Sequence, residues 1–301
     1  MLNIIQKRIY AYIFSGILTA ASIALLFFWG LNLGIDFKGG TLMEVRFALS
    51  ETPSVPMIQE KIGGLGLQSL TIQPTGDQSV LLRYLASDDN ANQAVLGALH
   101  SLDPGITQLR TDFIGGSVSN QITRNAITGT LLSILGIALY IAWAFRGVSG
   151  AVTSWEYGIG AVIALAHDII ITLGVFSILG HFYGVEVGVP FIAAILTILG
   201  YSVNDSIVVY DRVRENLQRR SSKEPFELLV NRSLNETLGR SINTSLTVII
   251  TLIAIVLFGG ESIRWFGVAL LVGVGFGTYS SIYIASALLV TRYNIKKGIG
   301  R

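Results

Sequence analysis

The chain has no cysteine among its 301 residues, so disulfides, thiolate metal sites and cysteine nucleophiles are all excluded. Histidine is nearly as scarce, and His100, His167 and His181 are scattered without the spacing of metal ligands. The sequence also lacks a phosphate-binding loop, a dinucleotide fingerprint and a hydrolase nucleophile elbow. We therefore expect a chain that is not an enzyme, has no ATPase activity, and needs no metal, cofactor or nucleic-acid partner.

Charge is scarce as well, since only 13% of the residues are charged and 51% are apolar. The mean hydropathy of +0.61 is far above that of an ordinary soluble domain, which indicates an integral membrane protein. The runs that approach or exceed the roughly 20 residues of a membrane-spanning helix are residues 9–31, 126–145, 157–180, 185–210, 244–258 and 265–291. The first run is too long for a cleavable signal peptide, whose apolar core is about 7–15 residues, so we predict an uncleaved span.

Positive charges predict the orientation. They lie before the first run, between the second and third, between the fourth and fifth, and after the sixth. With six crossings all of these segments fall on one side, and the short loops opposite carry only Arg264. Because short cytoplasmic loops are rich in Lys and Arg, we predict that both termini are cytoplasmic.

Residues 32–123 are mixed in polarity and fall outside the cytoplasm in this arrangement. Strand signals cover residues 41–49, 67–73, 79–85 and 106–114, and helical spacing covers residues 55–62 and 88–102. The order β-α-β-β-α-β is that of a ferredoxin-like fold. We predict a first transmembrane helix over residues 1–31, an extracytoplasmic α+β domain over 32–123 and a five-helix transmembrane region over 124–301.

Within that last region, residues 211–243 are predicted to be a charged cytoplasmic connection. Its apolar residues suggest one or two amphipathic helices at the membrane surface: Leu217, Phe226, Leu229, Val230 and Leu234. The alternative is a solvated face that only satisfies the positive-inside rule.

A carboxylate stands inside the fourth run, where Asp205 follows Asn204. A charge at the centre of a span costs about 2.5–3.5 kcal/mol on insertion scales, and such residues usually face the protein interior and mark ion or substrate pathways. We predict an ion-coupling role for Asp205, with Asn204 beside it. The structural alternative is an aspartate near the helix end that reaches the interface.

Asp168 lies near the middle of the third run, with Thr172 one helical turn later. His167 precedes it, and because consecutive helical residues point to different faces we expect no preformed His167–Asp168 pair. Two interpretations stay open for Asp168. One is a role in transport, and the other is a structural bond to a serine or threonine of a neighbouring helix.

The fifth run begins with a polar stripe, since Asn243, Thr247 and Thr251 recur every four residues. Arg240 lies about one turn before it. A polar stripe is poorly placed against lipid, so we expect it to face Asp205, with Arg240 as the counter-charge. The alternatives are threonines that only hold helices together and an arginine that only anchors the cytoplasmic side.

Small residues recur at every fourth position of the last run, as Gly273, Gly277 and Ser281. We read them as sites of close helix contact and assign them no chemistry. The carboxylates, by contrast, have hydroxyl and amide neighbours and suggest reversible protonation. One proton that crosses a potential of 100 mV supplies about 2.3 kcal/mol, which could bias a conformational change of a few kcal/mol.

Four segments resemble one known family, and they are "GIDFKGGTLMEVRF", "HD", "GYSVNDSIVVYDRVREN" and "TLGRSINTSLT". Together they resemble the SecF branch of the SecD/SecF family of bacterial protein-export subunits, which is related to the resistance-nodulation-division (RND) transporters. The resemblance covers nearly the whole chain. The third of these segments is specific, whereas "FKGG" alone is weak.

The resemblance implies a function and a set of partners. Chains of this kind pair with SecD, or are fused to it, in a pseudo-symmetric twelve-span unit that works with the SecYEG translocon in the bacterial inner membrane. The unit uses a proton gradient, or in some members a sodium gradient, to help draw preproteins across. The implied partners are SecD, SecYEG, the translocating preprotein, YajC, YidC and membrane lipids, and the implied coupling ion is H⁺ or Na⁺.

The resemblance also implies roles for single residues. Asp205 is similar to the ion-coupling aspartate of the family, Arg240 to its motif arginine, and Asp168 to its His-Asp motif in the third span. Gly39 and Gly40, shortly after Asp36, match the glycine pair at the membrane exit. There we expect a tight turn without Cβ atoms between the helix and the first strand.

Three other functions are compatible with part of the pattern. The chain could be a passive scaffold that recruits accessory proteins to the translocon, or half of an RND-type exporter of small molecules or lipids. An intramembrane aspartyl protease would also place aspartates on consecutive spans. Such enzymes need Tyr-Asp and Gly-x-Gly-Asp contexts, and the "AHD" and "VND" of this sequence supply neither.

Overall fold

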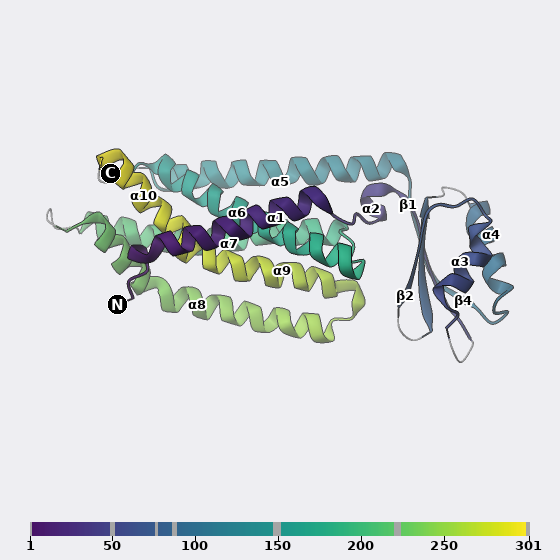
Figure 1. The fold of residues 1–301 in the computed structure, drawn as a ribbon. Coiled ribbons are helices and arrows are strands. Elements are labelled where there is room, and N and C mark those ends of the chain that lie inside the picture. Colours follow the sequence, from purple (N-terminus) through teal and green to yellow (C-terminus); the bar gives the residue numbers. More distant parts are fainter. Residues whose placement is uncertain are drawn as a thin grey trace. The chain divides into compact units, whose positions relative to one another are not determined.

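The computed structural model describes residues 2–48, 52–75, 78–85, 89–146, 152–219 and 224–298. It divides into two compact units, which are Met1–Asn32 with Ile127–Arg301, and Leu33–Ala126. The first unit is a bundle of helices and the second is built around a sheet (Figure 1). The sequence placed these boundaries at residues 31/32 and 123/124.

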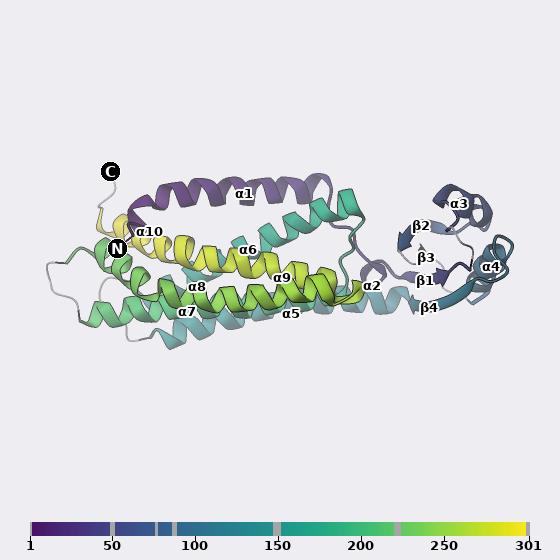
Figure 2. The ribbon, with the colours of Figure 1, turned by 90° about the horizontal axis from the view of Figure 1, so that it is seen from below.

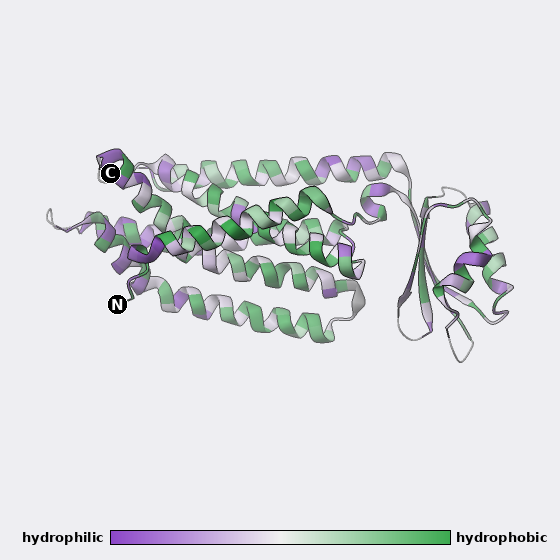
Figure 3. Ribbon diagram, in the orientation of Figure 1, coloured by the Kyte–Doolittle hydropathy of each residue, from purple (hydrophilic) through white to green (hydrophobic). Residues whose placement is uncertain are grey.

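The described residues contain six helical segments that are long and apolar enough to cross a membrane, which confirms the predicted number. They are α1 (Arg8–Phe28), α5 (Gly116–Ala144), α6 (Ser154–Tyr183), α7 (Val189–Gln218), α8 (Phe226–Phe258), and a last segment made of α9 (Glu261–Ser280), η2 (Ser281–Ala285) and α10 (Ser286–Lys297). Both chain ends lie at one end of the bundle (Figure 1), where hydrophilic residues gather (Figure 3).

Local sequence signals explain several helix ends. A capping box of Thr153 and Glu156 starts α6, and Gly184 ends it in the left-handed conformation with φ +66°. A proline in the first turn, which needs no backbone donor there, starts α7 after Gly188. These signals fix where the spans begin and end, and so set the depth of the polar groups that they carry.

The predicted connection over residues 211–243 differs from the structure. Helix α7 continues through Gln218 and α8 already begins at Phe226, so most of this stretch extends the fourth and fifth spans. The side chains of Phe226, Leu229 and Leu234 are buried in the core of the bundle rather than laid on a membrane surface. The apolar residues were read correctly as one face of a helix, but that face packs on protein.

The last span packs closely on α7. A Cβ atom at Gly277 would lie 3.0 Å from the Cβ of Ser202, and one at Gly273 would overlap Ile198. The absence of side chains at these positions lets the two helices approach, as the small-residue pattern predicted. Figure 2 shows α7, α8 and α9 running along one another.

The second unit contains β1 (Gly40–Arg46), α3 (Val55–Gly63), β2 (Gln68–Thr75), β3 (Ser79–Leu85), α4 (Asp89–His100) and β4 (Thr107–Ile114), preceded by the short α2 (Ile35–Lys38). The strands form one antiparallel sheet in the order β2-β3-β1-β4, which confirms the ferredoxin-like pattern. The inward residues of β1 and β3, such as Val45 and Leu82, are completely buried with Ile58 of α3 and Val95 of α4. Residue 88, the predicted first residue of the second helix, lies outside the described residues.

Candidate functional site

Asp168 is completely buried in the middle of α6, with 0% of its surface exposed. Its Oδ2 accepts hydrogen bonds from the hydroxyls of Ser202 on α7, at 2.6 Å, and Ser280 on α9, at 2.7 Å. Thr172 donates to the backbone carbonyl of Asp168, at 2.8 Å, and not to its carboxylate. The structural alternative for Asp168, bonds to serines of neighbouring helices, therefore describes its contacts, and a transport role remains a proposal.

His167 and Asp168 do form a pair, so the prediction that they point apart was wrong. Nδ1 of His167 lies 2.9 Å from Oδ1 of Asp168, and both side chains are buried. Consecutive side chains leave a helix about 100° apart, but each is long enough to turn toward the other when both face protein. The other ring nitrogen, Nε2, is buried and has no hydrogen-bond partner among the described residues.

Asp205 is half-buried on α7 and accepts two hydrogen bonds. The hydroxyl of Ser241 on α8 donates to Oδ1 at 2.6 Å, and that of Ser281 in η2 donates to Oδ2. Among the residues that the structure describes, no cationic side chain forms an ion pair with it. Asp205 is thus held by hydroxyls from two other segments and is not an aspartate that reaches out alone.

The polar stripe of α8 faces the other way from the prediction. Asn243, Thr247 and Thr251 are exposed, and the two threonine hydroxyls donate to carbonyls of their own helix, at 2.8 and 3.0 Å. The buried polar face of α8 carries Ser241 and Ser245 instead. Threonine can satisfy its hydroxyl within its own helix, so it does not need to face inward.

Arg240 and Asn204 are both exposed, and the predicted Arg240–Asp205 ion pair is not present among the described residues. Arg240 lines a pocket of about 230 Å³ together with Asp211, Arg214 and apolar residues of α5 and α7. Arg240 lies about half-way along α8, directly before Ser241, and its role remains a proposal.

The last span joins the polar groups of three other helices. Thr278 donates to Ser245 of α8 at 2.6 Å, Ser280 to Asp168 of α6, and Ser281 to Asp205 of α7. Ser281 also begins η2, a single π-helical stretch, and π turns inside α-helices are frequent at functional sites. Sequence analysis gave Ser281 only a packing role and did not select the other two residues. The adjacent serines of "TYSSIY" inside an apolar run were the available signal.

The glycine pair forms a turn in the second unit that requires glycine. Gly39 and Gly40 have φ values of +75° and +115°, where only glycine is comfortable, and a Cβ atom at Gly40 would lie 2.6 Å from the carbonyl oxygen of Tyr84. Asp36 lies in α2, just before the pair. Burial lowers the pKa of the Arg83 guanidinium to about 10, and the charge of Asp36 partly offsets this lowering.

No group of three or more His, Asp or Glu side chains among the described residues could hold a metal ion. The chemistry available to the site is therefore that of two carboxylates, an imidazole and several hydroxyls. Such groups can accept, hold and release a proton, or offer oxygen atoms to a small cation.

Two family models match the sequence. The model described as "Protein export membrane protein SecD/SecF, C-terminal" matches residues 94–294, and the "SecD/SecF GG Motif" matches residues 24–48. The second match contains Gly39 and Gly40.

Curated proteins and solved structures agree with these models. The chain is 39% identical to "Protein translocase subunit SecF" of Anaerolinea thermophila, over 96% of this chain and 94% of that protein. It is 38% identical to the protein of the same name from Haemophilus influenzae, over 94% of this chain and 83% of that one. The crystal structure of SecDF from Thermus thermophilus, described as a translocon-associated membrane protein, matches with a TM-score of 0.84 and 34% identity. That match covers 97% of this chain and 39% of the SecDF chain.

Proposed function

This chain belongs to the SecF branch of the SecD/SecF family of protein export membrane proteins, and we propose that it is one half of an ion-driven export motor. In this proposal it pairs with SecD and uses an H⁺ or Na⁺ gradient to help draw preproteins through SecYEG. Membership in the family makes it a component of protein transport rather than an enzyme.

Asp205 is the observation that carries the proposal. It is a carboxylate in a helix of membrane-spanning length, held by Ser241 and Ser281 and without a cationic partner among the described residues. Hydroxyl donors stabilise an ionised carboxylate only in part, so binding of H⁺ or Na⁺ would remove an unfavourable charge from the span. With about 2.3 kcal/mol available per charge and 100 mV, a change of state at this residue can bias a movement of the bundle.

The proposed location is the bacterial inner membrane, with both termini in the cytoplasm. The two termini and the charged ends of α7 and α8 share one end of the bundle, which agrees with the positive-inside rule (Figure 3). In this orientation the sheet unit is extracytoplasmic, because it follows the first crossing.

The proposed partners follow from the family and from the length of the chain. A chain that corresponds to 39% of the SecDF structure supplies part of such an assembly, so SecD should provide the other six spans. The outer faces of α1, α5 and α8 expose many apolar side chains that SecD and membrane lipids could cover. SecYEG, the preprotein, YajC and YidC complete the proposed set of partners.

The test is export into inverted membrane vesicles that carry this chain with SecD and SecYEG. Asp205→Asn should abolish the part of export that depends on the ion gradient, while its matched control Asp211→Asn, an exposed aspartate on the same helix, should retain it. Imposing a proton gradient or a sodium gradient separately identifies the ion. Full gradient-dependent export by Asp205→Asn at normal expression would instead support a passive scaffold.

A substrate test addresses the exporter alternative. If the chain were half of an RND-type exporter, vesicles without any preprotein should accumulate small apolar compounds or lipids in a gradient-dependent manner. No such accumulation is expected from an export motor.

A further inference from the structure

Two consecutive serines of the last span hold two carboxylates on different helices. Ser280, the last residue of α9, donates to Oδ2 of Asp168 on α6 at 2.7 Å. Ser281, the first residue of η2, donates to Oδ2 of Asp205 on α7. One dipeptide therefore contacts both Asp168 and Asp205.

Helix α7 forms a second connection between the same two groups. It carries Asp205, and its Ser202, one helical turn earlier, donates to Oδ2 of Asp168 at 2.6 Å. Ser202 and Ser280 are both completely buried, so neither hydroxyl can exchange its bond to Asp168 for one to water without a movement of the helices. The two carboxylates are thus connected through two helices.

Each serine hydroxyl has a second acceptor within its own span. Ser280 lies 3.2 Å from the carbonyl of Gly277, and Ser281 lies 2.9 Å from the carbonyl of Thr278. A hydroxyl carries a single proton, so it donates either to the carboxylate or to the carbonyl. The bond to an ionised carboxylate is the stronger one, and it weakens when the carboxylate takes up a proton. Each serine therefore has two positions that depend on the charge of its aspartate.

The groups around each carboxylate define what can titrate. Asp168 faces His167 on its own helix, and the ring of His167 stacks on that of Tyr279 from α9 at 6.2 Å between centroids. Tyr279 accepts from Ser15 of α1, and α7 presents the hydroxyl of Ser202. Among the described residues, Asp205 meets only the hydroxyls of α8 and η2. Among the described residues, His167 is the only basic side chain that pairs with either carboxylate.

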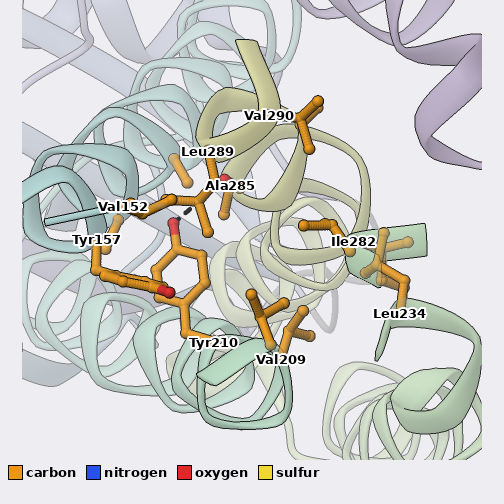
Figure 4. Close-up of a cluster of buried hydrophobic side chains, with 14 of the residues drawn as sticks. Val152, Tyr157, Val209, Tyr210, Leu234, Ile282, Ala285, Leu289 and Val290 are labelled. Carbon is orange, nitrogen blue, oxygen red and sulfur yellow. Dashed lines mark hydrogen bonds between the residues drawn. The ribbon is translucent and has the colours of Figure 1, made fainter. Parts of the chain in front are cut away.

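Side-chain hydroxyls bind carbonyl groups of the π turn itself. Ser281 and Ala285 are the first and last residues of η2. The hydroxyl of Ser286 donates to the carbonyl of Ser281 at 3.1 Å, and the hydroxyl of Tyr210 donates to the carbonyl of Ala285 at 3.3 Å. Figure 4 shows Tyr210 of α7 pointing at Ala285 within the buried cluster. Side chains thus complete the hydrogen bonding at both ends of the π turn, directly after the serine pair.

We propose that Asp168 and Asp205 form one two-carboxylate coupling unit, in which Ser280 and Ser281 are positioning residues that transmit proton uptake at one aspartate to the other. The inference rests on the proposed ion coupling and adds Asp168 as a second group that takes up a proton. Proton uptake converts a carboxylate to a carboxylic acid with no other change of bonds. The serine that donated to this carboxylate then donates to the carbonyl of its own span. Because Ser280 and Ser281 are consecutive, the other serine moves with it.

The direct test is difference infrared spectroscopy of the full chain with SecD in liposomes, recorded across a pH step. Asp168→Asn and Asp205→Asn assign the carboxylic-acid bands of the two residues by their loss. We expect Asp205→Asn to shift the frequency of the Asp168 band. The shift should become smaller when Ser281→Ala is also present, because only the connection through Ser202 then remains. It should keep its full size with Ser281→Thr or with Ser177→Ala, a buried serine of α6 that donates to the carbonyl of Leu25.

Two results would overturn the inference: an Asp168 band that is the same with and without the Asp205 carboxylate, or no Asp168 band at any pH. If Asp168→Asn does not accumulate in the membrane, Ser280→Ala makes the assignment instead, since it removes one donor from the same carboxylate.

Export measurements separate this inference from the proposed function. Ser280→Ala and Ser281→Ala should each reduce gradient-dependent export about tenfold, the loss expected for one hydrogen bond to a charged group, while Ser177→Ala should not. If Asp205→Asn abolishes export but leaves the Asp168 band unchanged, ion coupling stands and the two-carboxylate unit falls. If Asp205→Asn exports normally, the proposed function falls, and the infrared comparison still decides whether the carboxylates are coupled.

Discussion

Replacement of Gly40 by alanine should specifically destabilise the sheet unit. Gly40 starts β1 with φ +115°, and a Cβ atom there would lie 2.6 Å from the backbone oxygen of Tyr84 on the neighbouring strand. An unfavourable backbone conformation costs about 1–3 kcal/mol, and forcing an extra carbon into packed atoms costs about 1–3 kcal/mol. We therefore expect Gly40→Ala to lower the free energy of unfolding of this unit by about 2–6 kcal/mol, out of the 5–15 kcal/mol typical of a small domain.

The control is Gly97→Ala in the middle of α4, where the added Cβ would meet no atom within 4 Å. Alanine is the better helix former, so this change should stabilise the unit by about 0.5–1 kcal/mol. Native-state hydrogen exchange of the full chain, read by mass spectrometry on peptides from β1 and β3, gives the opening free energy of the sheet. Equal protection of these peptides in Gly40→Ala and the parent chain, within about 0.5 kcal/mol, would refute the steric argument.

Three further outcomes are expected from other contacts. Burial raises the pKa of Tyr84 to about 12, above its usual 10.0, so the protonated phenol stabilises the fold and this contribution is lost as the pH rises through 10 to 12. Tyr84→Phe should flatten the alkaline loss of stability in a pH series of hydrogen exchange, and an unchanged slope would contradict this. Asn231→Ala removes the acceptor for the backbone amides of Ile4 and Ile5, so it should cost about 1–3 kcal/mol and speed proteolysis of the N-terminus. Thr247→Val on the exposed face of α8 should change neither thermal stability nor export, whereas Ser241→Ala should lower export; equal effects would mean that the face was assigned wrongly.

Much of the fold follows from single-sequence patterns. The spans are visible because lipid requires long apolar runs, and the strands of the sheet unit are visible because one face of each is buried. The turn at Gly39 and Gly40 was expected from the absence of side chains. The end of α7 and the start of α8 were not predicted, because charged residues alternate there with the apolar residues of a buried face. Phe226 and Leu229 belong to that face.

The site was less accessible to such reasoning. Asp205 and Asp168 stand out because a carboxylate is rare in an apolar run, but their partners are serines, which occur throughout the sequence. Periodicity placed Thr247 on a polar face correctly and then pointed that face inward, because the sequence does not show which side of a helix meets protein. The pairing of His167 with Asp168 depends on side-chain rotamers, which spacing does not determine.

The π turn that begins at Ser281 would allow the last span to rotate about its axis in a way that a regular α-helix would not. Each residue of an α-helix advances it by about 100° and 1.5 Å, and the wider turn of η2 holds residues at a different pitch. If η2 changed to α-helical geometry, α10 would rotate by about 100° relative to α9. The basic residues of its last turn, Lys296 and Lys297, would then face in a different direction. A change of hydrogen bonding between Ser281 and Asp205 would then appear as a rotation of α10.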